Sequence, residues 1–361
     1  MTDKPLGGFF TLSDLEAAAS KKVAGPAWAY VQGGAGEEQT MKANREAFNR
    51  RTLRPRVLVD VETLDLSTTI LHEKVSAPFY ISPTAYQGLL HPDGELATAR
   101  AASAANVLAV FSTISSRSLE EIAQAAPAGP RWFQLYLQPE FSTTQSLIDR
   151  AENAGYTALV LTVDAPVFGN RDGTVQAGFN ASSIPLGNGT QVFPPTHPTL
   201  QGQHYHTRGE ASSTWGILDR LRKMTRLPLL VKGILTGEDA RKAVDHGVDG
   251  VIVSNHGGRQ LDQAQASLDA LPEVLGEVGS EVDVYLDSGV RRGSDVLIAL
   301  ALGAKAVGLG RLVLWSLAAG GVEGVARMLT LLKEDLATIM ALTGRRTITE
   351  VDSTLLGKPN R

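Results

Sequence analysis

Apolar and polar positions follow a repeated layout along most of the chain, in which short apolar runs alternate with longer amphipathic stretches. Eight short runs rich in β-branched residues predict buried strands: Pro78–Ser82, Leu108–Thr113, Arg131–Leu137, Ala158–Asp164, Pro228–Gly233, Gly250–His256, Val282–Asp287 and Ala306–Gly310. Helical spacing between most of them predicts helices at Gly94–Ala105, Ser118–Ala126, Thr143–Ala154, Ser213–Thr225, Thr236–His246, Ser267–Val278 and Gly293–Leu302, and a last helix pair over Val313–Leu342.

This alternation predicts an α/β fold, and eight strand–helix units favour a (β/α)8 TIM barrel. An open doubly wound sheet shows the same alternation and is the alternative at this point. Its usual dinucleotide motif is missing, because no GxGxxG follows any of the strands, and the chain has no GxxxxGK[ST] loop either.

Segments before and inside the repeat complete a single predicted domain over residues 1–361. Residues 1–74 form an N-terminal helical extension in which Ser13 and Glu16 have capping-box spacing, and residues 75–342 form the barrel. The long polar stretch 170–212 follows the fourth strand and predicts a lid-like loop at the catalytic end. An insertion without a role is the alternative.

Composition narrows the function classes. The 361 residues carry a net charge of −4, so no basic excess favours binding to nucleic acid or to an anionic membrane. The chain has no cysteine, which removes disulfides, thiolate metal sites and cysteine nucleophiles, and no metal site is expected. The first residues lack a secretory pattern, and the longest apolar candidate, Val296–Ala304, is too short to span a membrane. We expect a cytoplasmic protein.

Polar residues stand at the carboxyl end of every predicted strand, where barrel enzymes place their chemistry. In chain order these residues are Pro83, Thr84 and Ala85; Ser112; Gln134 and Tyr136; Thr162 and Asp164; Lys232; Ser254 and His256; Asp287, Ser288, Gly289 and Arg291; Gly310 and Arg311. Each alone fits an ordinary turn or surface, but their recurrence predicts a barrel mouth that holds a large polar ligand.

The last two strand ends predict a phosphate site, because glycines there permit close backbone approach and Arg291 and Arg311 supply donors. Turn glycines with surface arginines are the alternative. Lys232 on the fifth strand requires an anionic partner, which suits the electron-rich edge of a reduced flavin. A Schiff-base lysine of a barrel aldolase is the rival interpretation.

The segment after the sixth strand carries the candidate base. His256 is followed by two glycines and Arg259, a combination suited to a substrate whose carboxylate lies next to the proton removed. Asp164 at the fourth strand end is placed to orient a protonated His256. A hydrogen-bonded histidine at the barrel rim is the alternative for His256 taken alone.

The run Ser254–Asp262, Ser-Asn-His-Gly-Gly-Arg-Gln-Leu-Asp, resembles the active-site signature of the FMN-dependent 2-hydroxy-acid oxidase family, whose members include glycolate, lactate and hydroxymandelate oxidases. The resemblance extends from about Tyr30 to Leu342 and includes Phe133–Tyr136, Leu161–Asp164 and Val231–Gly233.

The resemblance implies a role for each matching residue. His256 takes a substrate proton, Asp164 pairs with the imidazolium, and Tyr136 contacts the substrate hydroxyl. The substrate carboxylate is bound by Tyr30, Arg259 and Arg171. The flavin ring of FMN is held by Pro83, Thr84, Ala85, Ser112, Gln134, Thr162, Lys232 and Ser254, and its ribityl phosphate by Asp287, Ser288, Gly289, Arg291, Gly310 and Arg311.

Two departures concern the substrate. Ile114 stands where glycolate oxidases have Trp, and Tyr86 stands where they usually have Met. We therefore expect L-lactate or a larger (S)-2-hydroxy acid. With no cytochrome-like or membrane segment recognised, we expect O2 as acceptor and hydrogen peroxide as product, a dye-, quinone- or cytochrome-coupled dehydrogenase being the alternative. The family resemblance further implies a homotetramer.

Overall fold

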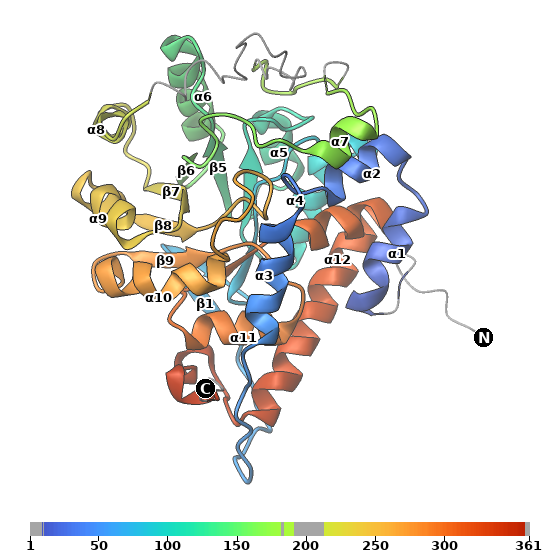
Figure 1. Cartoon of the computed structure of the whole chain (residues 1–361), viewed down its shortest axis with the longest axis vertical. Coiled ribbons are helices and arrows are strands. Elements are labelled where there is room, and N and C mark those ends of the chain that lie inside the picture. The colour runs from blue at the N-terminus through green and yellow to red at the C-terminus, as the bar shows by residue number, and fades with distance from the viewer. Residues whose placement is uncertain (1–8, 10, 182–183, 191–212, 358–361) are drawn as a thin grey trace.

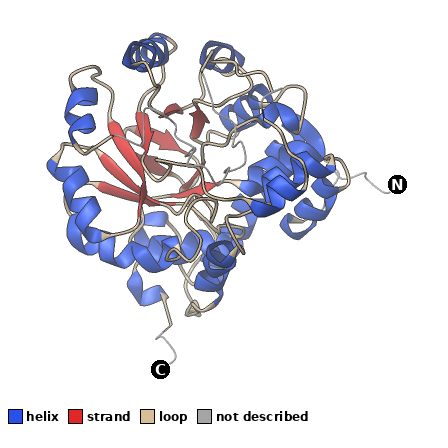
Figure 2. Ribbon diagram, turned by 45° about the horizontal axis from the view of Figure 1, so that its top comes forward, coloured by secondary structure: helices blue, strands red, loops and turns tan. Residues whose placement is uncertain are grey.

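A computed structural model describes residue 9 and residues 11–181, 184–190 and 213–357. Its centre is a closed barrel of eight parallel strands in the order β10-β3-β4-β5-β6-β7-β8-β9, with helices around it (Figure 2). The strands are β3 (Phe79–Ile81), β4 (Ala109–Ser112), β5 (Arg131–Leu135), β6 (Leu159–Thr162), β7 (Leu229–Ile234), β8 (Gly250–Val253), β9 (Asp283–Leu286) and β10 (Val307–Leu309). The predicted TIM barrel is confirmed, and the open sheet is excluded.

Seven strands lie inside their predicted ranges, and β7 runs one residue further, to Ile234. The β7–β8 register shifts between Lys232 and Ile234, at Gly233, whose φ is +114°. A Cβ on Gly233 would lie 2.5 Å from the Cβ of Asp164. This bulge at a glycine therefore makes room for the Asp164 side chain at the end of β6.

The surrounding helices close to the predicted ones are α4 (Glu95–Ala104), α5 (Leu119–Ala125), α6 (Phe141–Asn153), α8 (Gly216–Arg222), α9 (Gly237–Asp245), α10 (Ser267–Val278), α11 (Gly293–Ala301) and α12 (Arg311–Leu342). Local chemistry sets some of their starts. Ser118 and Glu121 form a capping box on α5, and the Thr236 side chain accepts from the Asp239 N–H at the start of α9. Non-helical backbone at Gly320 and Gly321 breaks α12 into the predicted helix pair.

The N-terminal extension contains α1 (Leu15–Ser20), α2 (Gly25–Gln32) and α3 (Gln39–Asn49), which lie along one side of the barrel (Figure 1). The predicted capping box at Ser13 and Glu16 is wrong. The Asp14 carboxylate instead accepts from the Thr11 N–H, because a short 3-10 turn over Leu12–Asp14 precedes α1. Glu16 is thereby left to accept a hydrogen bond from Gln32 on α2.

Two strands and one short helix had no counterpart in the sequence prediction. An antiparallel pair, β1 (Thr68–Ile70) and β2 (Glu73–Val75), lies within the region predicted to be extended and turn-rich. The short helix α7 (Asp172–Gln176) lies within the predicted lid-like loop. Residues 182–183 and 191–212 of that loop are outside the described residues, so its role as a lid stays a prediction.

One end of the barrel is filled by aromatic side chains. Tyr80, Trp132 and Tyr285 point inward, with ring centroids 5.9–6.4 Å apart. Ile70 and Val75 of the β1–β2 pair pack against the same cluster, and the Leu71 N–H donates to the Tyr285 hydroxyl at 3.2 Å. This end lies toward the amino termini of the strands, and we call it the closed end.

The side chains that face the barrel interior form an apolar layer and, two residues further along each strand, a mainly polar layer. The apolar layer is Tyr80, Val110, Trp132, Val160, Leu230, Ile252, Tyr285 and Ala306. Two residues on, the corresponding positions are Ser82, Ser112, Gln134, Thr162, Lys232, Ser254, Asp287 and Gly308. Because side chains on one face of a strand recur every second residue, the second layer forms the floor of the carboxyl-terminal mouth.

The helix α12 is long and apolar enough to cross a membrane by length and composition alone. However, 72% of its most apolar window is buried inside the fold, where α12 packs against α4, α1 and α11. Burial of this extent is the pattern of a core helix.

Candidate active site

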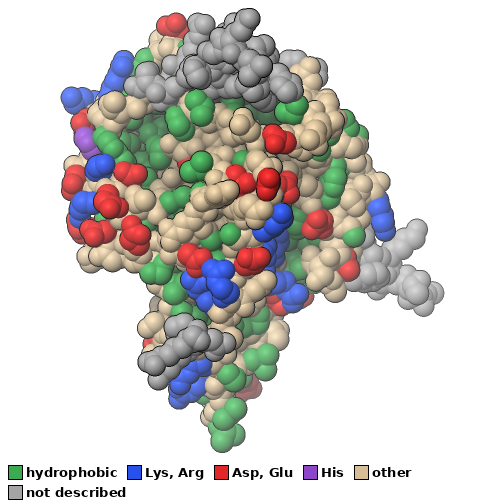
Figure 3. Space-filling model, viewed as in Figure 1, with side chains coloured by type: hydrophobic (Ala, Val, Ile, Leu, Met, Phe, Trp, Pro, Cys, Tyr) green, Lys and Arg blue, Asp and Glu red, His purple; other side chains and the backbone are tan. Residues whose placement is uncertain are grey.

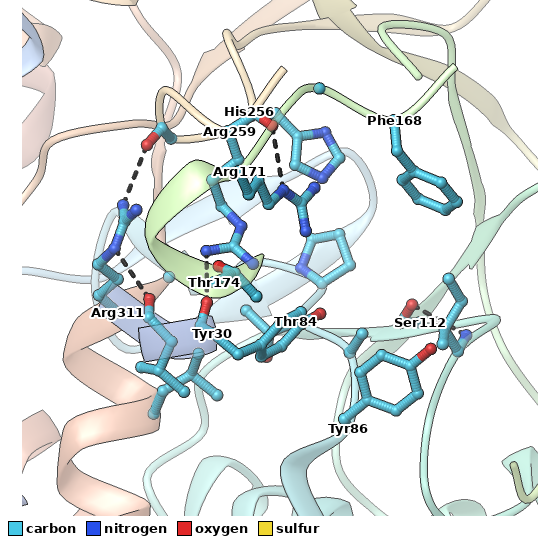
Figure 4. Close-up of a pocket in the computed structure, with 18 of the residues that line it drawn as sticks. Tyr30, Thr84, Tyr86, Ser112, Phe168, Arg171, Thr174, His256, Arg259 and Arg311 are labelled. Atoms are coloured by element: carbon cyan, nitrogen blue, oxygen red, sulfur yellow. Dashed lines mark hydrogen bonds between the residues drawn. The ribbon is translucent and has the colours of Figure 1, made fainter. Parts of the chain in front are cut away.

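A cavity of about 930 Å³ opens at the carboxyl-terminal mouth of the barrel. Its size is within the usual range for a cofactor or ligand site. Figure 4 shows side chains from several different strand ends and from α2 and α7 converging on it. Of the residues predicted for the site, those that line the cavity are Tyr30, Pro83, Thr84, Ala85, Ser112, Gln134, Tyr136, Thr162, Arg171, Lys232, His256, Arg259, Asp287, Ser288, Gly289, Arg291, Gly310 and Arg311. Asp164 and Ser254 do not line the cavity, but both contact His256, which does.

The candidate base His256 is held in place by Asp164 and Ser254. Its Nδ1 lies 2.8 Å from Oδ1 of Asp164, and its backbone N–H donates to Oγ of Ser254 at 3.0 Å. The contact with Asp164 fixes the proton on Nδ1 and leaves Nε2 as the acceptor. The pair predicted from sequence is therefore formed in the structure.

Burial lowers the pKa of His256 below its ordinary value, and the nearby Asp164 carboxylate only partly offsets that effect. Burial raises the pKa of Asp164, but its contact with His256 and the positive charge of Lys232 outweigh burial and leave that pKa below its usual range. At neutral pH the site thus holds a neutral imidazole beside an ionised carboxylate. That combination is the one needed to accept a proton and then stabilise the resulting cation.

Two arginines near His256 present positive charge to the cavity. The guanidinium of Arg259 donates to the backbone carbonyls of Tyr30 and Gly33, both at 2.7 Å, and lies 4.8 Å from the Tyr30 ring centroid. Arg171 donates to the carbonyl of Arg259 and to the side-chain oxygen of Gln260, both at 3.2 Å. Burial, followed by the charge of Arg171, lowers the pKa of Arg259 to about 10.

Two further arginines, Arg291 and Arg311, also line the cavity. Arg311 donates to the carbonyls of Val31, Gly33 and Gly257, and Arg291 donates to the carbonyl of Val290. Burial lowers the pKa of Arg311 well below its ordinary value, and the charges of Arg259 and Arg291 add to that effect. Within the part of the chain that the structure describes, none of the four arginines forms a carboxylate ion pair. The cavity is therefore suited to two anionic groups.

The glycines next to Arg291 and Arg311 in the sequence permit a ligand to approach the backbone closely. A Cβ on Gly310 would meet no heavy atom within 4 Å, so the backbone there faces open cavity. Gly310 immediately precedes α12, so the amino end of this helix begins beside the same open space. The geometry supports the phosphate site predicted from these glycines and arginines.

Lys232 also lines the cavity and is 4% exposed. Its Nζ donates to Oγ of Ser254 at 3.0 Å and lies 3.6 Å from Oδ2 of Asp287. Ser254 thus holds Lys232 and His256 from behind, in place of touching a ligand directly. The ion pair with Asp287 suits a fixed ammonium group at the cavity floor.

One buried donor at the floor lacks a partner. Oε1 of Gln134 accepts from the Ser112 hydroxyl at 2.9 Å, which fixes the orientation of the amide. Its Nε2 is buried with no hydrogen-bond partner among the described residues. Since buried polar groups are normally satisfied, this amide is set to donate to a ligand that carries acceptor atoms.

Sequence reasoning missed part of the wall. Phe179 stacks on Tyr30 with ring centroids 4.5 Å apart, and Phe168 and Val175 also line the cavity. All three lie in the polar stretch after β6, where no periodic pattern marks them. Among the described residues, no group of three or more His, Asp or Glu side chains is placed to hold a metal ion.

These features define a flavin-dependent barrel enzyme, and comparison with known proteins gives the same class. The model of the FMN-dependent dehydrogenase family matches residues 19–358, so the chain belongs to that family and its cofactor is FMN. The cavity fits this group, since it offers an unpaired amide donor, a buried lysine, and a phosphate cradle of glycines and arginines.

Curated relatives and solved structures agree with this class. The chain is 46% identical to human 2-hydroxyacid oxidase 2 over 345 residues, covering 96% of this chain and 97% of that protein. It is 43% identical over 354 residues to L-lactate oxidase from a Nostoc species, with 96% and 97% covered, and 42% identical over 349 residues to glycolate oxidase 3 of Arabidopsis thaliana, with 94% of each covered. A crystal structure of mandelate oxidase with benzoyl-formic acid superimposes with a TM-score of 0.87 at 40% identity, covering 97% of this chain and 98% of that one.

Proposed function

We propose that this protein oxidises an (S)-2-hydroxy acid, L-lactate or a larger one, to the 2-oxo acid and reduces O2 to hydrogen peroxide. The substrate loses two electrons and two protons, and O2 gains both, so the reaction balances without a further reactant. The observation that carries the proposal is the neutral His256, paired with Asp164, facing a cavity whose nearby guanidinium groups have no carboxylate partner among the residues that the structure describes.

Bound FMN supplies the two-electron acceptor that the side chains lack. Arg259 and Arg171 would bind the substrate carboxylate, with Tyr30 beside them, and so fix the neighbouring carbon near His256. His256 would take the substrate proton at Nε2, and Asp164 would stabilise the imidazolium. Tyr136 would contact the substrate hydroxyl, and Lys232 would hold its charge at the edge of the flavin.

The substrate preference rests on two neighbouring wall residues. The backbone N–H of Tyr86 donates to the carbonyl of Ile114 at 3.1 Å, and both residues line the cavity. Hence the two departures from the glycolate oxidase pattern lie side by side. An aliphatic Ile114 leaves more room than an indole, which favours a substrate with a side chain on the hydroxylated carbon.

Comparison of kcat/KM for glycolate, L-lactate, a longer (S)-2-hydroxy acid and (S)-mandelate tests this preference. We expect glycolate to rank below L-lactate or a larger acid, and Ile114→Trp to shift the ranking toward glycolate. Glycolate as the best substrate of the unmodified enzyme would contradict the proposal. O2 consumption and dye reduction, measured in the same assays, would identify a dehydrogenase by slow turnover with O2 and fast turnover with the dye.

A Schiff-base aldolase using Lys232 is the remaining alternative. Membership of the FMN family and the contacts of Lys232 with Ser254 and Asp287 do not support it. Borohydride trapping with a keto acid would leave Lys232 unmodified if the proposed function is correct.

The proposed assembly is a homotetramer in the cytoplasm. An exposed apolar tip supports self-association: Val57, Leu58 and Leu342 are 82%, 103% and 66% exposed. Figure 3 shows apolar side chains at the protruding lower end of the molecule. Light scattering would measure the assembly, and Leu58→Asp is expected to weaken it. Cell fractionation would test the location.

A further inference from the structure

A pair of buried amides connects the N-terminal extension to the segment that carries His256. Nδ2 of Asn44 on α3 donates to Oδ1 of Asn255 at 2.9 Å, and Nδ2 of Asn255 donates to Oδ1 of Asn44 at 2.7 Å. The two side chains are 2% and 3% exposed. They are 211 positions apart in the sequence, and Asn255 immediately precedes the base.

Both amide side chains form further hydrogen bonds with the loop between β8 and α10 and with the start of α10. Oδ1 of Asn255 also accepts from the Gly258 N–H at 3.1 Å, and its Nδ2 donates to the Gln265 carbonyl at 3.0 Å. Oδ1 of Asn44 accepts from the Ser267 N–H at 3.2 Å. The pair therefore fixes both ends of the loop between β8 and α10.

The loop segment held in this way has an unfavourable backbone conformation. His256, Gly257 and Gly258 have φ values of +59°, +69° and +75°. A left-handed conformation costs free energy for a side chain such as histidine and persists only where surrounding contacts impose it. Some of those contacts must act on this turn from outside it.

The helix α3 and the residues before it supply such contacts. A Cβ on Gly258 would lie 2.6 Å from the backbone nitrogen of Met41, so the loop is pressed against the start of α3. The Gly258 carbonyl accepts from the Ala35 N–H at 2.8 Å. The side chain of Asn44 is the part of this contact surface that reaches the residue next to His256.

We propose that Asn44 is a positioning residue for catalysis, which acts through Asn255 to hold His256 in the left-handed turn that aims its imidazole into the cavity. Asn44 does not line the cavity, so the effect is indirect. The inference rests on the proposed role of His256 as base. Without Asn44, Oδ1 and Nδ2 of Asn255 would lose a partner in a buried site, and the turn would relax toward a more favourable conformation.

The first test is Asn44→Ala, with Asn49→Ala as the matched control because Asn49 is exposed on the same helix. Misplacement of a reacting group by about 1 Å costs about 100-fold in rate, so we expect the rate of flavin reduction to fall 10- to 100-fold. Rates are measured per bound FMN at saturating substrate. The control variant is expected to match the unmodified enzyme.

A double-mutant cycle separates positioning from general destabilisation. If Asn44 acts through Asn255, then Asn44→Ala combined with Asn255→Ala will be about as slow as the slower single variant. Losses that multiply would show that the two residues act independently and would overturn the proposal. So would a normal rate per bound FMN in Asn44→Ala.

A readout independent of turnover addresses His256 itself. Peptide mass spectrometry of the holoenzyme treated with diethyl pyrocarbonate gives the rate of His256 modification as a function of pH. We expect the midpoint in Asn44→Ala to move up toward the ordinary pKa of histidine, since a loosened His256 is less buried. An unchanged midpoint and rate would contradict the proposal.

If Asn44→Ala does not retain FMN, Asn44→Asp serves instead, because it keeps the shape and Oδ1 but replaces the donor by a carboxylate oxygen that faces Oδ1 of Asn255. Its expected kinetic loss is in the same direction, and a normal rate in this variant overturns the inference. Failure of the proposed function is distinguishable, since the unmodified enzyme would then reduce its flavin with none of the 2-hydroxy acids.

Discussion

The two ends of the barrel are built by the same eight strands, but they differ in almost every physical property. At the amino end, the buried rings of Tyr80, Trp132 and Tyr285 pack together in the interior. One pleat further on, Gln134 and Asp287 replace Trp132 and Tyr285 in the inward layer, and the interior opens. The shift from stability to chemistry thus takes two residues along a strand.

The two ends also differ in what they contribute to the stability of the fold. The closed end buries apolar surface and pairs the Tyr285 hydroxyl, while the Tyr80 hydroxyl has no hydrogen-bond partner among the described residues. Within the described ranges, the open end keeps an unpaired amide on Gln134, a left-handed His256 and several arginines without a carboxylate. Such features lower stability and are retained where a ligand compensates them. Substitutions at the two ends should therefore affect different measured quantities.

The largest expected effect is at the open end. His256→Ala removes the proposed base, and general-base catalysis contributes about 10²- to 10⁴-fold, so flavin reduction should slow by about that factor while FMN stays bound. Stopped-flow measurement of anaerobic flavin reduction checks this. Ile252→Val, in the apolar layer of the same strand, is the control and should react normally. Loss of FMN from His256→Ala would mean that this residue holds the cofactor.

The pH dependence of the unmodified enzyme follows from the same residue. The neutral imidazole is the active form, and burial holds the pKa of His256 below its ordinary value. Thus kcat/KM should rise with pH through a midpoint below about 6.5 and be level at neutral pH. A midpoint above the ordinary value of histidine would contradict the assigned environment.

At the closed end, Trp132→Ala should lower the free energy of unfolding by about 3–5 kcal/mol, because it leaves a large cavity between Tyr80 and Tyr285. Denaturant titration measures the loss. The rate of flavin reduction per bound FMN should stay near that of the unmodified enzyme. A drop comparable to that of His256→Ala would show that the two ends are not separable.

Lys232→Met tests the floor between the two layers. Removal of the ammonium should make bound FMN harder to reduce, since a charge-assisted contact of about 1.5–3 kcal/mol corresponds to about 30–60 mV for a two-electron couple. Potentiometric titration of the bound flavin gives the value. An unchanged potential would place Lys232 away from the flavin.

The smallest effect is expected for Tyr285→Phe at the closed end. The hydroxyl donates to Asp283 at 3.0 Å and accepts from the Leu71 N–H at 3.2 Å, so its removal should cost about 1 kcal/mol of stability. Thermal or chemical denaturation detects this, and turnover should not change. A larger loss would indicate that this contact anchors the β1–β2 pair.

The sequence predicted the barrel because each strand is a compact apolar run and polar residues follow every run. It missed the β1–β2 pair for a local reason: the turn between the strands is Leu71-His72, with Leu71 at φ +49°, and lacks the glycine or asparagine that normally marks a hairpin. The sequence at this turn therefore does not predict the two strands beside it.

In the candidate site, too, some features could be predicted from the sequence and others could not. Residues at strand ends, such as Lys232 and His256, could be predicted because position along a strand determines where they lie. The stacking of Phe179 on Tyr30 and the pairing of Asn44 with Asn255 could not. Each joins segments far apart in the chain, and only the closed fold brings them together.

Anaerobic mixing of the FMN-loaded enzyme with L-lactate or a larger (S)-2-hydroxy acid tests the central claim most directly. The account predicts that the visible absorption of the flavin is bleached and that O2 restores it with formation of hydrogen peroxide, whereas His256→Ala with the same FMN content stays oxidised. A flavin that none of these acids reduces, or one that they reduce equally well in His256→Ala, would contradict it.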